Sequence, residues 1–110
     1  MADYNLVVIV GKVMEKPKSG HSDQGFPSVT FPIAIHHQTV LPDGNVKKSV
    51  TFVNVIAWAD QAVICAKFLK KGASVLVSGR LEQEEVSRKY RVKAARVQFL
   101  DPAPKESKRG

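Results

Sequence analysis

The chain has 110 residues, 44% of them hydrophobic and 25% charged, which is typical of one globular domain and excludes a multi-domain enzyme. Five basic and four acidic residues give residues 1–50 a charge of +1, while twelve and six give residues 51–110 a charge of +6. The total of +7 favours a polyanionic partner, with nucleic acid first, and no apolar run is long enough to cross a membrane. The N-terminus lacks a signal-peptide pattern and Cys65 is a lone cysteine, so we expect a cytoplasmic protein.

The first quarter of the chain predicts one strand and a long loop. Residues 6–13 form a β-branched run interrupted by Gly11, where a strand commonly bulges or bends. Residues 15–27 supply Lys, Pro, Ser, Gly and Asp without apolar periodicity, so we expect them to form a loop throughout.

A β-hairpin is predicted next. From Val29 apolar and other residues alternate with a period of two, which indicates a half-buried strand, although Pro32 favours an edge or a bulge there. Residues 41–45, Leu-Pro-Asp-Gly-Asn, are a turn signal, and a further strand runs over residues 49–58.

One helix is expected between Asp60, which can cap its N-terminus, and Gly72, which suits a left-handed stop. Apolar residues recur at helical spacing between them and should bury one face. That face comprises Ala62, Cys65, Ala66 and Leu69.

The last part of the chain predicts two more strands, at residues 74–81 and 89–100, with a bulge where Ala94-Ala95 shifts the alternation. Residues 102–110 are expected to be a short disordered basic tail after a single domain of residues 1–101. An all-β chain with one short helix, in the order β-β-β-α-β-β, is typical of the five-stranded OB-fold barrel, which binds oligonucleotides across its second and third strands.

The strand at residues 49–58 could supply a binding face. Alternation puts Val53, Val55 and Ala57 inside the barrel, which leaves Phe52, Asn54 and Trp58 on the outer side. Exposed aromatic rings on a basic sheet are stacking platforms for unpaired bases, although Phe52 and Trp58 are as readily explained as core or subunit-interface residues. The candidates for phosphate contacts are Lys12, Lys47, Lys48, Lys70, Lys71, Arg80, Lys89, Arg91 and Lys93.

Catalytic and metal sites are not predicted. His36 and His37 are neighbours on a strand and so point to opposite faces, which does not suit a shared metal ion. Residues 21–23, His-Ser-Asp, lie in a loop without the geometry that activates a nucleophile, and Cys65 lies on the apolar helix face as an inert thiol. We therefore expect a binding module with no catalytic residue, metal or cofactor.

Four ordered blocks carry a family resemblance: Asn-Leu-Val-Val-Ile-Val-Gly at 5–11, Phe-Val-Asn-Val-Ile-Ala-Trp at 52–58, Phe-Leu-Lys-Lys-Gly at 68–72 and Val-Ser-Gly-Arg-Leu at 77–81. Through these blocks the chain resembles the bacterial single-stranded DNA-binding proteins over residues 4–100.

The resemblance implies an OB-fold, a homotetramer or possible dimer, no cofactor, and coating of single-stranded DNA without sequence specificity during replication, recombination and repair on the nucleoid. By position, Phe52 and Trp58 match base-stacking sites, and Lys70 and Lys71 match a basic pair near the DNA.

The chain departs from the family pattern at several positions. Thr39 and Val86 stand where members often have aromatic residues. Members also end in an acidic tip that recruits replication and repair proteins, whereas this sequence ends with Lys-Glu-Ser-Lys-Arg-Gly at 105–110, so either it stops short of that tip or it lacks the recruiting role. Three glutamates that should repel phosphate occupy a hairpin that is usually basic, namely Glu82, Glu84 and Glu85. These departures leave two alternatives open: a dimeric OB-fold adaptor resembling primosomal replication protein N, and a protein that binds RNA.

Overall fold

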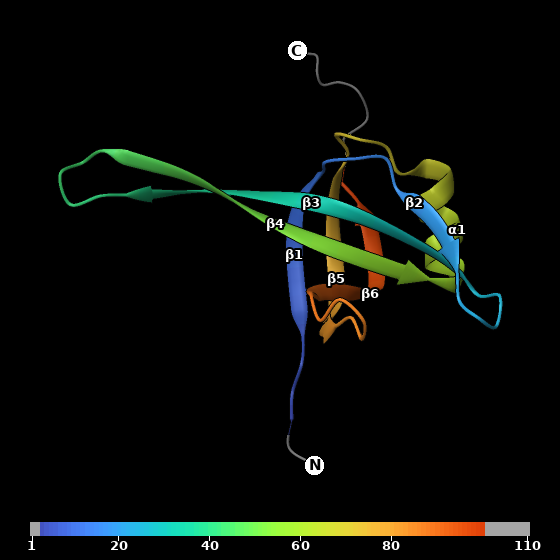
Figure 1. Ribbon diagram of the computed structural model, residues 1–110. Helices are drawn as coiled ribbons and strands as arrows, with labels where there is room; N and C mark the ends of the chain where they lie inside the picture. The colour runs from blue at the N-terminus through green and yellow to red at the C-terminus, as the bar shows by residue number, and fades with distance from the viewer. Residues whose placement is uncertain (1–2, 101–110) are drawn as a thin grey trace.

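The computed structural model describes residues 3–100, so the predicted tail lies outside the described residues. Strands β1 (Val7–Val13), β2 (Lys18–His21), β3 (Pro27–Val40) and β4 (Val46–Trp58) precede helix α1 (Ala59–Phe68), and β5 (Ser74–Gln83) and β6 (Tyr90–Phe99) follow it (Figure 1).

The strands close into a barrel. They hydrogen-bond in the order β1-β5-β6-β4-β3-β2, and β1 also pairs with β3 through Lys12 with Ala34 and Val13 with Ile33. Gly11 permits this closure, because a Cβ atom there would lie 2.5 Å from the carbonyl oxygen of Ala34. The closed five-stranded barrel with α1 between β4 and β5 confirms the OB-fold, and β2 is an additional edge strand.

The barrel interior is the hydrophobic core. Val55 and Ala57 face inward and are buried, as the alternation of β4 predicted, while Val53 is partly buried. The other buried residues of this cluster come from every barrel strand and from α1: Val13, Val29, Phe31, Ile33, Ala62, Cys65, Leu69, Val75, Val77, Val92 and Ala94.

The prediction of a loop throughout residues 15–27 was wrong, because Lys18–His21 forms β2 and pairs with β3 from Thr30 to Pro27. This strand has no apolar alternation because it lies at the sheet edge and its side chains are largely exposed. Pro32 causes no bulge, since β3 stays in register with β4 there. It lies where β3 passes from β2 to β1, and only its carbonyl is used, by the N–H of Met14 at 2.9 Å.

The predicted N-cap of the helix was also wrong. Trp58 occupies the cap position without a side-chain cap hydrogen bond, and Asp60 lies in the first turn. The reason is that β4 runs directly into α1 through Ala59, whose φ is +55°, which leaves no loop residue to act as a cap.

The helix ends at Phe68, four residues before Gly72. Leu69 leaves the helical conformation and buries its side chain in the core, while its N–H donates to the carbonyl of Cys65 at 2.9 Å. Gly72 does have a left-handed φ of +92°, but in the turn before β5. Ala66 is exposed rather than buried, because the helix turns only Ala62, Cys65 and the residue after its end toward the barrel.

The hairpin of β3 and β4 is long and projects from the barrel as an arm (Figure 1). Its turn is as predicted: Leu41 donates to the carbonyl of Asn45 at 2.8 Å, and Gly44 has a φ of +88°. The bulge in β6 is confirmed too, because the register passes from Ser78–Arg96 to Gly79–Ala94 and leaves out one β6 residue.

Candidate nucleic-acid interface

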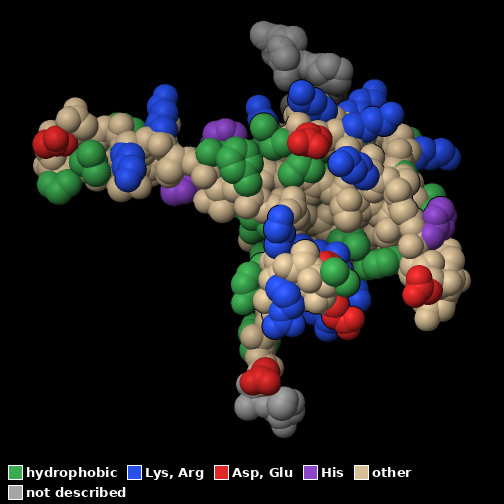
Figure 2. Space-filling view, viewed as in Figure 1, with side chains coloured by type: hydrophobic (Ala, Val, Ile, Leu, Met, Phe, Trp, Pro, Cys, Tyr) green, Lys and Arg blue, Asp and Glu red, His purple; other side chains and the backbone are tan. Residues whose placement is uncertain are grey.

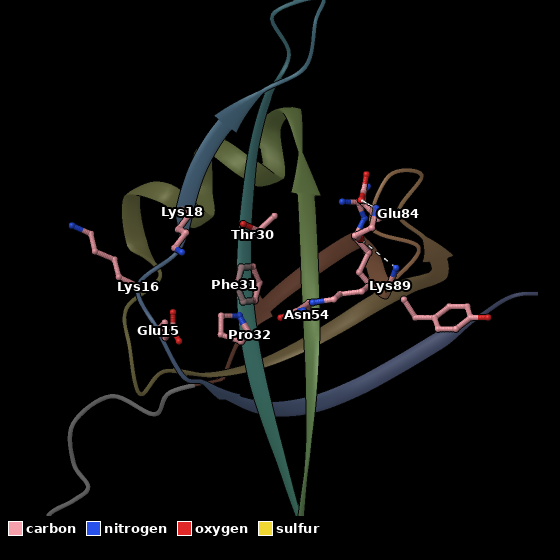
Figure 3. Close-up of a pocket in the computed structure, with 12 residues that line it drawn as sticks. Glu15, Lys16, Lys18, Thr30, Phe31, Pro32, Asn54, Glu84 and Lys89 are labelled. Atoms are coloured by element: carbon pink, nitrogen blue, oxygen red, sulfur yellow. Dashed lines mark hydrogen bonds between the residues drawn. The ribbon is translucent and has the colours of Figure 1, made fainter.

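A groove of about 390 Å³ crosses the outer face of β3 and β4, between the β1–β2 connection and the β5–β6 hairpin (Figure 3). Its floor is Thr30, Pro32 and Asn54, which point out of the barrel because they alternate with buried core residues. The other lining residues are Glu15, Lys16, Lys18, Phe31, Glu84, Ser87, Lys89, Tyr90 and Arg91. The arrangement matches the face and loops through which OB-folds bind oligonucleotides.

The walls of the groove are charged. Figure 3 shows Lys16 and Lys18 on the side of the β1–β2 connection, and Lys89 on the opposite hairpin. These three ammonium groups have no ion pair within residues 3–100 and are exposed, so they are available to phosphate oxygens.

Arg91 is engaged by an acidic neighbour. Its Nε donates to Oε2 of Glu82 at 2.6 Å, across a register pair of β5 and β6. The two side chains are only 26% and 25% exposed, so the pair is partly shielded from water. The predicted phosphate ligand therefore has to share its guanidinium with Glu82.

Glu84 turns its carboxylate back into its own hairpin. Oε1 accepts the N–H of Ser87 at 2.7 Å and Oε2 accepts the N–H of Val86 at 3.1 Å. Hydrogen bonds from Ser87, and then from Val86, lower the pKa of Glu84 from 4.5 to about 2. Two of the three hairpin glutamates thus have partners, and Glu85 has neither a hydrogen bond nor an ion pair among the described residues.

Phe52 does not line the groove, but it lies on the same outer face of β4 and is 64% exposed. It lies two residues from Asn54 on the same side of β4, which places it about 7 Å further along the strand. In this chain Phe52 is therefore not a core residue. Trp58, toward the other end of the same face, is half-buried opposite Ser28, and Ile56 before it is only 4% exposed.

The other predicted cations fall into two groups. Lys12 pairs with Ala34, which in turn pairs with Phe52, so the side chain of Lys12 lies on the same outer face as Phe52. Arg80 pairs with Lys93, which in turn pairs with Ile56, so these two side chains also lie on that face. None of these three residues lines the groove itself. Four other predicted cations lie farther from it: Lys47 and Lys48 on the arm, and Lys70 and Lys71 in the turn after α1, at the other end of the barrel from the β5–β6 hairpin (Figure 1).

Sequence reasoning found Asn54, Lys89 and Arg91 but missed much of the groove. Lys16 and Lys18 were dismissed with the supposed loop, although the connection after the first strand is one of the OB-fold's binding loops. Thr30 and Tyr90 were missed because an alternating strand pattern shows which side is buried, not which exposed residue lines a groove. Figure 2 shows the Lys and Arg side chains gathered mainly over the barrel.

The remaining predicted features are structural. His36 and His37 do lie on opposite faces, opposite Val50 and Ser49, and the Ser49 hydroxyl hydrogen-bonds the His37 ring at 3.0 Å. Cys65 is fully buried, and burial raises the pKa of its thiol to about 11. Within residues 3–100 no three His, Cys, Asp or Glu residues gather into a metal site, and no helix is long and apolar enough to span a membrane.

Comparison of the sequence gives consistent relatives. The sequence model described as "Single-strand binding protein family" matches residues 4–100. Single-stranded DNA-binding protein A of Bacillus subtilis is 33% identical over 105 residues, which cover 89% of this chain and 60% of that protein. The single-stranded DNA-binding protein of Treponema pallidum is 33% identical over 106 residues, covering 91% and 60%. The chain thus spans about 60% of the length of these relatives.

Comparison of the structure supports the same fold. The Plasmodium falciparum SSB complex with ssDNA superposes with a TM-score of 0.81 at 19% identity, over 92% of this chain and 98% of that one. The small single-stranded DNA-binding protein from Streptomyces coelicolor gives a TM-score of 0.73 at 23% identity, over 90% and 95%. Identities this low support the barrel fold alone.

Proposed function

The chain belongs to the single-strand binding protein family, and from this premise we propose that it coats single-stranded DNA without sequence specificity during replication, recombination and repair. The observation that carries the proposal is an exposed aromatic ring, Phe52, beside a groove with unpaired lysines on both walls. Bases stack on such a ring whatever their identity, while the lysines neutralise the backbone.

The DNA would cross the outer face of β3 and β4. A base stacks on Phe52, the neighbouring phosphates meet Lys16, Lys18 and Lys89, and Asn54 offers hydrogen bonds to a base edge from the floor. Lys12, Arg80 and Lys93 extend the basic surface on either side of this path.

Trp58 is the second proposed stacking site, through the part of its ring that is exposed. It lies six residues from Phe52 along β4, or about 20 Å, so the two rings would hold bases several nucleotides apart. Lys47, Lys48, Lys70 and Lys71 contact DNA only if the strand continues beyond the groove.

We also propose that copies of the chain associate, as a tetramer first and a dimer second. The β1 strand pairs with β3 only at Lys12 and Val13, so most of its second edge has no neighbouring strand within residues 3–100. Leu6, Val8 and Val10 are exposed apolar residues along it. Unprotected apolar edges of this kind are suited to pairing with another chain.

The protein acts in this proposal by binding alone, in the cytoplasm, with no catalytic step and no cofactor. The adaptor alternative has the same fold, and it differs in that single-stranded DNA binding would be weak or absent.

Titration of a fluorescein-labelled oligo-dT, followed by anisotropy, tests the proposal. Phe52→Ala should lower the affinity by about 1–3 kcal/mol, or roughly 5- to 150-fold, because a stacking platform is lost. Phe26→Ala is the matched control, since Phe26 is similarly exposed at 58% but lies in the β2–β3 turn and not on the outer face of β4 that carries Phe52 and Asn54.

Equal effects of the two substitutions would contradict the stacking role of Phe52. No binding of oligo-dT by the unaltered protein would contradict the proposed function and favour the adaptor, and tighter binding of a matched oligo-U would favour RNA.

A further inference from the structure

A second groove, of about 580 Å³, lies between α1 and the end of β6, and it shares no lining residue with the groove on β3 and β4. Its apolar walls are Ile64 and Phe68 of the helix and Val97 and Phe99 of the strand. Phe68 is 59% exposed and Ile64 is 44% exposed. Large apolar side chains clustered at such exposure indicate an interaction surface.

The two walls are held in fixed relation. The side-chain oxygen of Gln61 accepts the N–H of Val97 at 3.0 Å, which ties α1 to β6 at the groove itself. The N–H of Leu100 donates to the carbonyl of Ser74 at 2.9 Å and fixes the end of the strand. The groove is therefore preformed, and a ligand does not have to order it.

The charge around this groove is mainly positive. Arg96 lies in its wall, and Lys67 holds its ammonium 5.9 Å from the centre of the Phe68 ring. Lys70 and Lys71 lie two and three residues after the end of the helix. Asp60, in the first turn of α1, is the acidic residue nearest to the groove along the chain, and neither residues 61–81 nor residues 86–100 contain an Asp or Glu.

We propose that the α1–β6 groove binds an acidic segment of a partner protein, which inserts one or two large apolar side chains between Phe68 and Phe99 and sets its carboxylates against Arg96 and the neighbouring lysines. This inference does not depend on the function proposed for the β3–β4 groove.

Other occupants fit the surface less well. A second copy docked face to face would set Arg96 and Lys67 against their own equivalents. The chain's residues 101–110 carry three cations against two acids and no large apolar residue. Single-stranded DNA is less suited to this groove, because aliphatic Ile64 and Val97 offer no hydrogen bond to a base edge.

An array of short peptides tests the proposal, using labelled protein as the probe. One set combines several Asp or Glu residues with two Leu, Phe or Trp residues in varied spacing. Matched sets replace the apolar residues by Ser or the acidic residues by Lys. We expect binding only to the acidic–apolar set, and the tightest peptide is then carried into solution titrations.

Phe68→Ser and Arg96→Glu should each weaken that peptide by about tenfold or more, because one removes an apolar wall and the other reverses the charge in it. Lys47→Glu is the control, since it makes the same change in net charge on the distant arm, and it should alter the affinity by less than about twofold. All three side chains are exposed, and an unchanged melting temperature verifies the fold of each variant.

Absence of binding by the acidic–apolar set, or binding that both groove variants retain, would overturn the proposal. So would a shift of the oligomeric state by Phe68→Ser, which would assign the face to a second copy. If Phe68→Ser and Arg96→Glu lost oligo-dT binding but kept peptide binding, the α1–β6 groove would be assigned to DNA.

Discussion

The ion pair between Glu82 and Arg91 gives a sharp prediction, because it holds a groove arginine away from phosphate. Glu82→Gln removes the negative charge 2.6 Å from the arginine Nε while keeping the size of the side chain. The released guanidinium adds one phosphate contact, and each contact on single-stranded DNA steepens the slope of log affinity against log salt by about 0.7. Between 1 M and 0.1 M salt this contact raises the affinity by about fivefold, or about 1 kcal/mol.

The assay is an oligo-dT titration at several salt concentrations. Glu85→Gln is the control, since it makes the same charge change in the same hairpin at an exposed residue without an ion pair in the described part of the chain. Its slope should equal that of the unaltered protein. The cost of Glu82→Gln to folding should be about 0.2–1 kcal/mol, as for other cross-strand charge pairs. An unchanged slope of log affinity against log salt for Glu82→Gln, or an equally steepened slope for Glu85→Gln, would refute the reasoning.

Three further predictions concern the barrel and its hairpin. Gly79→Ala should destabilise the protein by about 3 kcal/mol, because a Cβ atom there collides with the carbonyl oxygen of Lys93. Gly20→Ala should be tolerated, since the nearest atom to its Cβ is the hydroxyl oxygen of Ser28 at 3.3 Å. Thermal melts of the two variants compare these effects. Glu84 has a folded pKa of about 2 against an ordinary 4.5, so its contribution to hairpin order is complete above pH 4.5 and is lost as the pH falls toward 2. Lower protection of the hairpin amides, measured relative to their intrinsic exchange rate at each pH, checks this, and unchanged protection would contradict it. The Cys65 thiol should react with a disulfide reagent only after unfolding, and rapid labelling of the native protein would show that it is accessible.

The sequence predicts the barrel well because its strands are half-buried. Alternation identified the inward Val55 and Ala57, and the doubled alanine before Arg96 identified the bulge in β6. It missed β2 because an exposed edge strand needs no apolar residues, so its four residues resemble a loop. The sequence misplaced the C-terminal end of the helix, because the burial of Leu69, and not Gly72 three residues later, decides where α1 stops.

The site was less predictable than the fold. Exposure of Phe52 follows from alternation, but the pairing of Arg91 with Glu82 depends on the β5–β6 register, which the bulge shifts by one residue. Lys70 and Lys71 were assigned by resemblance, and their distance from the β3–β4 groove depends on how α1 closes the end of the barrel. Local patterns carry no information about such pairings between distant segments.

Trp58 is the only tryptophan in the sequence, and its fluorescence tests the central claim most directly. It is half-buried on the proposed DNA face, so oligo-dT should quench its emission and an equal concentration of duplex DNA should not. Quenching should saturate and weaken as salt is raised, since phosphate contacts contribute to the binding. If neither oligo-dT nor duplex DNA changed the emission of Trp58, and the protein did not shift the mobility of oligo-dT in a gel, the assignment of this face to single-stranded DNA would be contradicted.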